Sequence, residues 1–203
     1  NKAVQFLEMV IAKQIALVVE WMRVGFIHGV MNTDNVAISG ETIDFGPCAM
    51  IGIYDPHTVY SSIDTKGRYA YGNQPNITLW NMTRLAECLL PLISNDEKVA
   101  IAIVEPLLMQ FSQQFEHAYF KMLANKLGLT EIAPSDQIFI AELLELMKNE
   151  RLDYTQLFTD LTQSLDDDNL AHKLKNKLGD WYDRWKVYSG NSQENMNIAK
   201  ALM

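Results

Sequence analysis

The sequence lacks several features that would assign a protein to a broad class. No run of about 18 apolar residues occurs, so no transmembrane helix is expected. The chain has only two cysteines, Cys48 and Cys88, and neither has a His or Cys at metal-ligand spacing. We therefore expect reduced, buried thiols in a cytoplasmic protein, without a disulfide framework or a zinc site. A net charge of −8 gives no general attraction to nucleic acids or anionic membranes.

The N-terminal residues also lack a signal-peptide layout and an initiator methionine. They open inside an amphipathic pattern, which leads us to expect that the 203 residues are a piece of a longer protein. A chain of this length that is 48% hydrophobic can bury one sizeable core, and one domain is the default expectation.

Apolar residues at helical spacing are the main pattern in the sequence. Residues 3–24 predict a buried helix that Gly25 ends. From residue 78 onward the pattern is helical, whereas residues 47–78 are rich in Gly, Pro and Tyr and predict a long functional loop. Further helices are expected over 78–93, 96–127, 134–148, 153–165, 169–187 and from Gln193 onward. The sequence therefore predicts a mainly α protein.

Two polar islands follow the first helix, from His28 to Asn35 and from Asp44 to Gly46. Between them, Val36–Ile38 and Thr42–Ile43 are strand formers around a Ser-Gly-Glu turn. We expect a small β-hairpin here, with the polar islands as the loops at its ends.

The polar islands contain oxygen ligands of the kind that Mg²⁺ prefers. Asn35 and Asp44 stand nine positions apart across the expected hairpin, and Asp34 beside Asn35 could accept a proton from an attacking hydroxyl. The competing interpretation is an ordinary hairpin, in which Asp and Asn only cap turns.

The order of the parts favours the catalytic interpretation. A buried helix, a His-Gly loop that ends in Asn, a hairpin and Asp-Phe-Gly form the layout of a kinase catalytic loop with its metal motif. We expect His28 to hold the loop backbone, and Gly29 and Gly46 to permit sharp turns. One position does not fit, because small-molecule kinases of this type place the base where this chain has Val30.

These motifs give the sequence a specific resemblance. WMRVGFIHGVMNTDN at 21–35 and TIDFGP at 42–47, followed by YDP at 54–56, GRY at 67–69, NQP at 73–75 and LWN at 79–81, resemble the SelO/YdiU family of kinase-like protein adenylyltransferases. The string HGVMNTDN is the most diagnostic part, and the motif resemblance covers roughly residues 20–93.

The resemblance implies a protein-kinase-like C-terminal lobe over residues 1–203. Its catalytic loop and metal motif would span 28–46, its activation-segment-like loop 47–78 and its helical region 79–203. Members of the family bind ATP in a flipped orientation and transfer AMP to Ser, Thr or Tyr hydroxyls of proteins. By this resemblance Asp34 is the proton acceptor, Asn35 and Asp44 bind Mg²⁺ or Mn²⁺, and Asp44 also contacts the nucleotide. The base has then moved from the position of Val30 to Asp34.

The family's glycine-rich loop, its Lys and the Glu partner belong to an N-terminal lobe, and the chain contains no match to them. We therefore expect the isolated chain to bind ATP weakly and to be inactive by itself. Two alternatives stay open, a catalytically dead pseudokinase scaffold and a conventional phosphotransferase.

The tyrosine-rich segment 54–71 allows two interpretations. It could bind a substrate, since its position corresponds to that of a kinase activation segment. The composition favours the other interpretation, in which Arg68 pairs with a nearby carboxylate and the tyrosines pack against helices.

Overall fold

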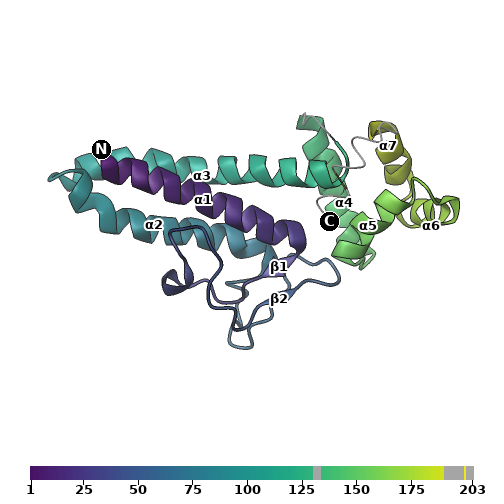
Figure 1. The fold of residues 1–203 in the computed structure, drawn as a ribbon, viewed down its shortest axis with the longest axis horizontal. Coiled ribbons are helices and arrows are strands. Elements are labelled where there is room, and N and C mark those ends of the chain that lie inside the picture. The colour runs from purple at the N-terminus through teal and green to yellow at the C-terminus, as the bar shows by residue number, and fades with distance from the viewer. Residues whose placement is uncertain (130–133, 190–198, 200–203) are drawn as a thin grey trace. The chain divides into compact units, whose positions relative to one another are not determined.

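The computed structural model describes residues 1–129, 134–189 and 199, and it is mainly helical (Figure 1). Its elements are α1 (Lys2–Val24), β1 (Phe26–Ile27), η1 (Thr33–Asn35), β2 (Ala49–Met50), η2 (Tyr71–Asn73), α2 (Gln74–Ile93), α3 (Glu97–Lys126), α4 (Pro134–Asn149), α5 (Tyr154–Gln163), α6 (Asp168–Leu178) and α7 (Asp180–Tyr188), where η marks a 3₁₀-helix. The mainly α class is confirmed. Among the described helices, none combines the length and apolar character needed to cross a bilayer.

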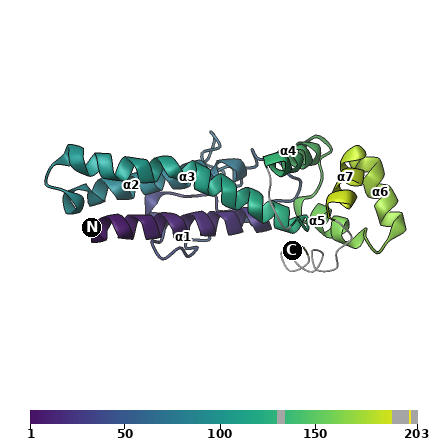
Figure 2. The same cartoon turned by 90° about the horizontal axis from the view of Figure 1, so that it is seen from above.

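The chain divides into two compact units. The first comprises residues 1–22, 26–49 and 56–118, and the second comprises residues 23–25, 50–55 and 119–203. In the first unit, α1, α2 and the first part of α3 run along one another (Figures 1 and 2). Leu7, Val18 and Met82 are among the side chains that they bury. All the residues expected at the candidate site lie in this unit.

The expected hairpin at 36–43 is wrong. Neither Val36–Ile38 nor Thr42–Ile43 is a strand, and the two strands are β1 and β2, which pair with each other on either side of this region. Helix α1 explains the difference, because Gln14 Nε2 donates to Ala37 O (2.7 Å) and Trp21 Nε1 donates to Thr42 Oγ1 (2.8 Å). Residues 36–43 therefore bond to the helix and form a turn, in which Gly40 N donates to Ala37 O (3.0 Å), without pairing as two strands.

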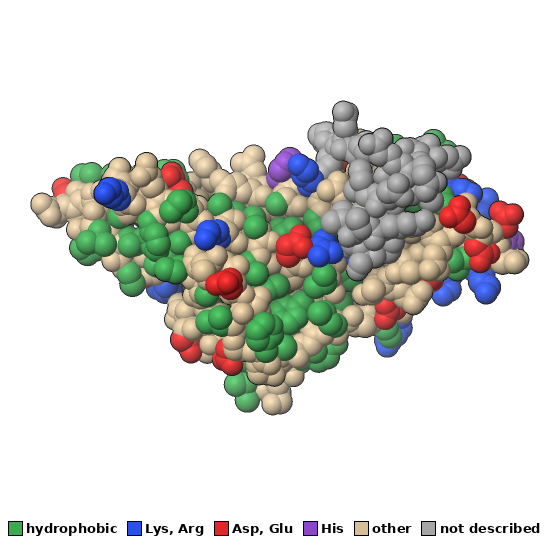
Figure 3. All heavy atoms as spheres, in the orientation of Figure 1, with side chains coloured by type: hydrophobic (Ala, Val, Ile, Leu, Met, Phe, Trp, Pro, Cys, Tyr) green, Lys and Arg blue, Asp and Glu red, His purple; other side chains and the backbone are tan. Residues whose placement is uncertain are grey.

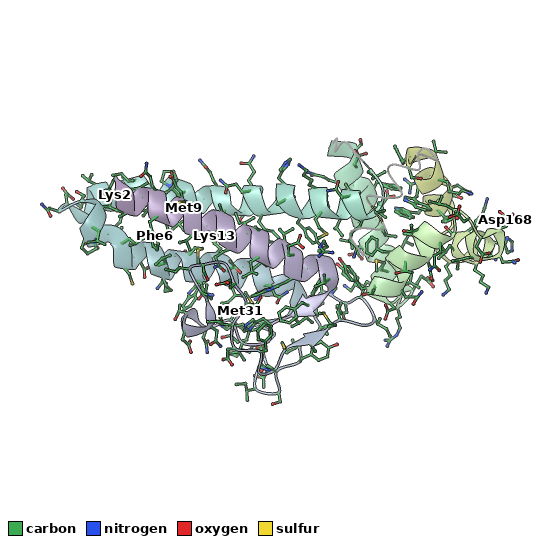
Figure 4. The ribbon with its side chains drawn as sticks, viewed as in Figure 1. Lys2, Phe6, Met9, Lys13, Met31 and Asp168 are labelled. Carbon is green, nitrogen blue, oxygen red and sulfur yellow. The ribbon has the colours of Figure 1, made fainter. Side chains whose placement is uncertain are left out.

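The turn at Gly40 packs closely on the same helix. Gly40 has a φ of +77°, and a Cβ added there would lie 2.9 Å from Lys13 Cβ. Figure 4 labels Lys13 on α1, and Met31 in the loops below it. The close approach requires glycine, since any side chain at this position would collide with the helix.

In the second unit, the helix expected over 169–187 is broken in two. Gly179 adopts a φ of 57° and a ψ of −138° between α6 and α7, a conformation that few other residues tolerate. Trp181, Tyr182 and Trp185 of α7 are buried, and Trp185 Nε1 donates to Leu127 O (3.0 Å). The helix expected from Gln193 lies outside the described residues, except for position 199.

Candidate functional site

The loop of His28, Gly29 and Val30 is the anchor of the candidate site. His28 is fully buried, and its Nε2 lies 2.8 Å from Ile43 O. Its Nδ1 accepts a hydrogen bond from Val30 N (3.4 Å), so the ring proton belongs on Nε2, which donates to Ile43. The expectation that His28 holds the loop backbone is confirmed.

Asn35 is attached to the same loop. It is the last residue of η1, and its Nδ2 donates to Val30 O (3.1 Å). This bond fixes the plane of the amide and leaves Oδ1 as the group that can accept or ligate. Asp34 precedes it in η1 and is exposed, so its carboxylate is accessible to a reacting group.

Asp44 reaches the loop from the other side, because its neighbour Ile43 accepts the bond from His28. Asp44 is exposed and has a φ of 54°, a left-handed conformation that is uncommon for any residue other than glycine. Such a backbone costs on the order of 1 kcal/mol and concentrates at functional sites. The sharp turn was expected at Gly46, but it lies on Asp44, and Gly46 has no positive φ.

Gly29 brings a third segment to the loop. Its φ is +85°, and a Cβ added there would lie 2.8 Å from Pro47 O. The structure therefore brings Asn35, the residue before Asp44 and Pro47 to the same three residues, 28–30. This arrangement attaches Asn35 and the backbone next to Asp44 to the same anchor.

Two amides of α2 support the site, although no role was predicted for either of them. Gln74 is buried, accepts a hydrogen bond from His28 N (3.1 Å) and donates to Phe26 O (3.0 Å). Asn81 is also buried and donates from Nδ2 to Met31 O (3.0 Å). The signal available in the sequence was two amides seven positions apart, a spacing that puts both on one face of a helix.

The tyrosine-rich segment agrees only in part with its expected packing. Tyr69 and Tyr71 are buried, and Tyr71 OH donates to Met22 O (2.7 Å). Arg68 was expected to pair with a carboxylate, and this is wrong among the described residues. Its guanidinium lies over the ring of Trp80, 4.8 Å from the centroid.

The site offers oxygen ligands to a cation. Both cysteines are free, but the expectation that they are buried is wrong, because Cys48 is half-buried and Cys88 is exposed. The described residues contain no group of three or more His, Cys, Asp or Glu side chains suited to a metal. A magnesium site needs no such group, because Mg²⁺ is commonly held by one or two protein oxygens together with phosphates and water. The accessible carboxylate of Asp44 and the oriented amide of Asn35 fit that requirement.

Comparison with known proteins identifies the family to which the chain belongs. Residues 1–198 match the family described as "Protein adenylyltransferase SelO". A "Protein nucleotidyltransferase YdiU" of Teredinibacter turnerae is 52% identical over 182 residues, which are 90% of this chain and 38% of that protein. The protein of the same name from Halalkalibacterium halodurans is 44% identical over 203 residues, covering 100% of this chain and 41% of that protein. The chain thus spans about two fifths of the length of these relatives. It belongs to the SelO family.

Proposed function

We propose that the protein containing this chain is an ATP- and Mg²⁺-dependent adenylyltransferase that modifies Ser, Thr or Tyr hydroxyls of other proteins. The observation that carries the proposal is the attachment of Asn35 and of the residue before Asp44 to one buried loop, with Asp34 exposed beside Asn35. The family description names an adenylyltransferase, and the relatives are named protein nucleotidyltransferases.

The proposed reaction assigns a separate task to each side chain. The carboxylate of Asp34 accepts the proton of the target hydroxyl, whose oxygen then bonds to the α-phosphorus of ATP. The bond from that phosphorus to the bridging oxygen breaks, and pyrophosphate leaves with the electron pair. The product is a phosphodiester between AMP and the protein, and Asp34 passes its proton to solvent.

Asn35 and Asp44 are the residues that would hold the metal, and Asp44 would also lie against the nucleotide. When bound, Mg²⁺ supplies positive charge that offsets the negative charge of the phosphates. His28 acts as a positioning residue, because its bond to Ile43 O fixes the backbone that carries Asp44.

We further propose that this chain forms the catalytic half of a kinase-like site, and that the phosphate-binding half lies in the remainder of the longer protein. Phe45 beside Asp44 is 62% exposed and Ile38 is 54% exposed. Figure 3 shows hydrophobic side chains gathered over these loops. An exposed apolar group of this kind beside polar side chains is typical of a surface that another segment covers.

The proposal is tested with the full-length protein, Mg²⁺ and ATP labelled on either the α- or the γ-phosphate. Adenylylation predicts that only the α-label enters protein acceptors, with release of pyrophosphate. Incorporation of the γ-label alone would show a conventional phosphotransferase. If neither label enters any acceptor, the protein is a pseudokinase scaffold and the proposal is wrong.

A further inference from the structure

Two arginines stack on one exposed tryptophan beside the candidate site. Trp80, on α2, is 40% exposed. The guanidinium carbon of Arg68 lies 4.8 Å from its ring centroid, and that of Arg84 lies 5.3 Å from it. Stacking of this kind holds a guanidinium in place while its N–H groups stay available at the edges.

The two arginines differ in their charge partners. Arg84 forms an ion pair with Glu87 at 2.6 Å. Arg68 has no carboxylate partner within the part of the chain that the structure describes. The carboxylate of Asp64 instead accepts from the backbone N–H groups of Arg68 (2.8 Å) and Tyr69 (2.7 Å). Arg68 is thus a positioned cation that can bind an external anion.

Hydrogen bonds attach Arg68 to the segment that carries Asp34. Tyr69 OH donates to Oδ1 of Asn32, the residue directly before η1. Asn73 Nδ2 donates to Arg68 O (2.6 Å) from the other side. The backbone of Arg68 is therefore fixed relative to the catalytic loop, as recognition of a group near the target hydroxyl would require.

Next to Arg84 is a cavity of about 290 Å³. Thr33, Val36 and Ile38 line it from the loop, and Asn81, Arg84 and Leu85 line it from α2. Asn81 is 3% exposed, and its buried Oδ1 has no hydrogen-bond partner among the described residues. The buried Nε of Arg84 also has none. Unsatisfied buried groups are costly, so Asn81 and Arg84 are two residues of the cavity lining with hydrogen-bonding capacity that the described residues do not use.

We propose that Arg68, Trp80, Asn81 and Arg84, the Trp80 surface, bind the protein substrate next to its target hydroxyl. A peptide segment that enters the cavity offers backbone donors and acceptors to Asn81 and Arg84. Arg68 then binds a Glu or Asp side chain of the same segment. This inference rests on the proposed function for the identity of the hydroxyl, but the peptide contact itself does not require transfer.

The charge distribution favours an acidic peptide over a nucleic acid. Nucleic-acid binding depends on many cations along a phosphate backbone. Here one unpaired arginine and one paired arginine flank a single aromatic ring, in a chain of net charge −8. A single acidic side chain matches that arrangement.

The test uses the full-length protein, α-labelled ATP and two series of synthetic peptides with one target hydroxyl. One series carries a single Glu moved position by position around the hydroxyl, and the other carries Gln at the same positions. We expect the Glu peptides to have about five- to tenfold higher kcat/KM at one or two positions, the gain typical of one charge-assisted hydrogen-bonded pair. The preference should fall as the salt concentration rises.

Arg68→Gln should bring the Glu-to-Gln ratio close to one, and Arg68→Lys should give an intermediate ratio because it keeps the charge without the planar stack. Lys173→Gln, which removes an exposed charge from α6, is the matched control and should keep the full ratio. A ratio that Arg68→Gln does not change would overturn the inference. So would an effect of Arg68→Gln on KM for ATP alone, because Arg68 would then bind the nucleotide.

Binding separates this inference from the proposed function. Fluorescence anisotropy of labelled Glu and Gln peptides is measured without ATP, on the wild type and on Arg68→Gln. If no α-label is transferred but Glu peptides bind more tightly through Arg68, the Trp80 surface stands and the proposed chemistry fails. If transfer occurs while Glu and Gln peptides bind and react equally, the inference fails and the proposed chemistry stands. Tighter binding of single-stranded DNA than of either peptide would also contradict it.

Discussion

The buried Lys126 allows a quantitative prediction of how pH changes the stability of the second unit. The residue ends α3 and is only 4% exposed, and its Nζ donates to Arg23 O (2.8 Å). The ammonium group also lies over the rings of Tyr154 (4.5 Å) and Phe158 (4.1 Å). Burial, followed by the charge of Arg23, lowers the pKa of Lys126 from 10.5 to about 7.

The direction of the shift fixes its effect on stability. Above pH 10.5 the lysine is neutral in both the folded and the unfolded state, so burial of its charge costs nothing. As the pH falls from 10.5 to 7, the unfolded state binds a proton that the folded state does not, and the free energy of unfolding decreases. Below pH 7 both states are protonated and the penalty stays constant. With 1.36 kcal/mol per pKa unit, the full penalty is about 5 kcal/mol, of which about 2 kcal/mol is relieved between pH 7 and 9.

The test compares Lys126→Met with the wild type by urea unfolding at pH 7 and pH 9. Relative to the variant, the wild type should gain about 2 kcal/mol at the higher pH, since all other titrating groups are shared. Lys121→Met, at an exposed position of the same helix, should show no such gain. A difference between the wild type and Lys126→Met that is equal at both pH values would refute the reasoning. The two rings and the carbonyl would then stabilise the ammonium enough to offset its burial.

Two further predictions concern the loop at the site. Gly29→Ala should lower the free energy of unfolding by about 2–4 kcal/mol, because it adds a collision with Pro47 O to the cost of a positive φ. Gly179→Ala should cost less, about 1–3 kcal/mol from its backbone conformation alone, because nothing lies within 4 Å of its added Cβ; a loss larger than that of Gly29→Ala in chemical denaturation would contradict the steric argument. His28→Ala should reduce label transfer at least tenfold by freeing Ile43 from the loop, and transfer at the wild-type rate would show that this bond does not position Asp44.

The sequence predicted the helices well because their signals are local. Asp153 and Asp167 accept hydrogen bonds from backbone N–H groups of the following turn, as capping residues do. Gly25, the predicted end of the first helix, and Gly128 both have a positive φ and follow the ends of α1 and α3. The break at Gly179 had a local signal as well, the glycine itself.

The prediction of a hairpin was wrong because the competing hydrogen bonds come from α1, which is distant in the sequence. Val36–Ile38 and Thr42–Ile43 have the composition of strands, but Gln14 and Trp21 of α1 donate hydrogen bonds to Ala37 and Thr42. The sequence gives no measure of which side chains of a distant helix will reach a loop. The partner of Arg68 was predicted wrongly for the same reason. Its guanidinium lies over the ring of Trp80, and the expected partner was a carboxylate.

The central claim is that Asp44, held beside Asn35 by the loop of His28, serves the metal and the nucleotide. The most direct measurement is transfer of the α-label from ATP to protein by full-length Asp44→Ala, with Glu41→Ala as a control for an exposed carboxylate of the same loop. We predict a loss on the order of 100-fold or more for Asp44→Ala, as expected when a group that binds the reacting charges is removed, and near wild-type transfer for Glu41→Ala. Transfer by Asp44→Ala at the rate of Glu41→Ala would contradict the claim.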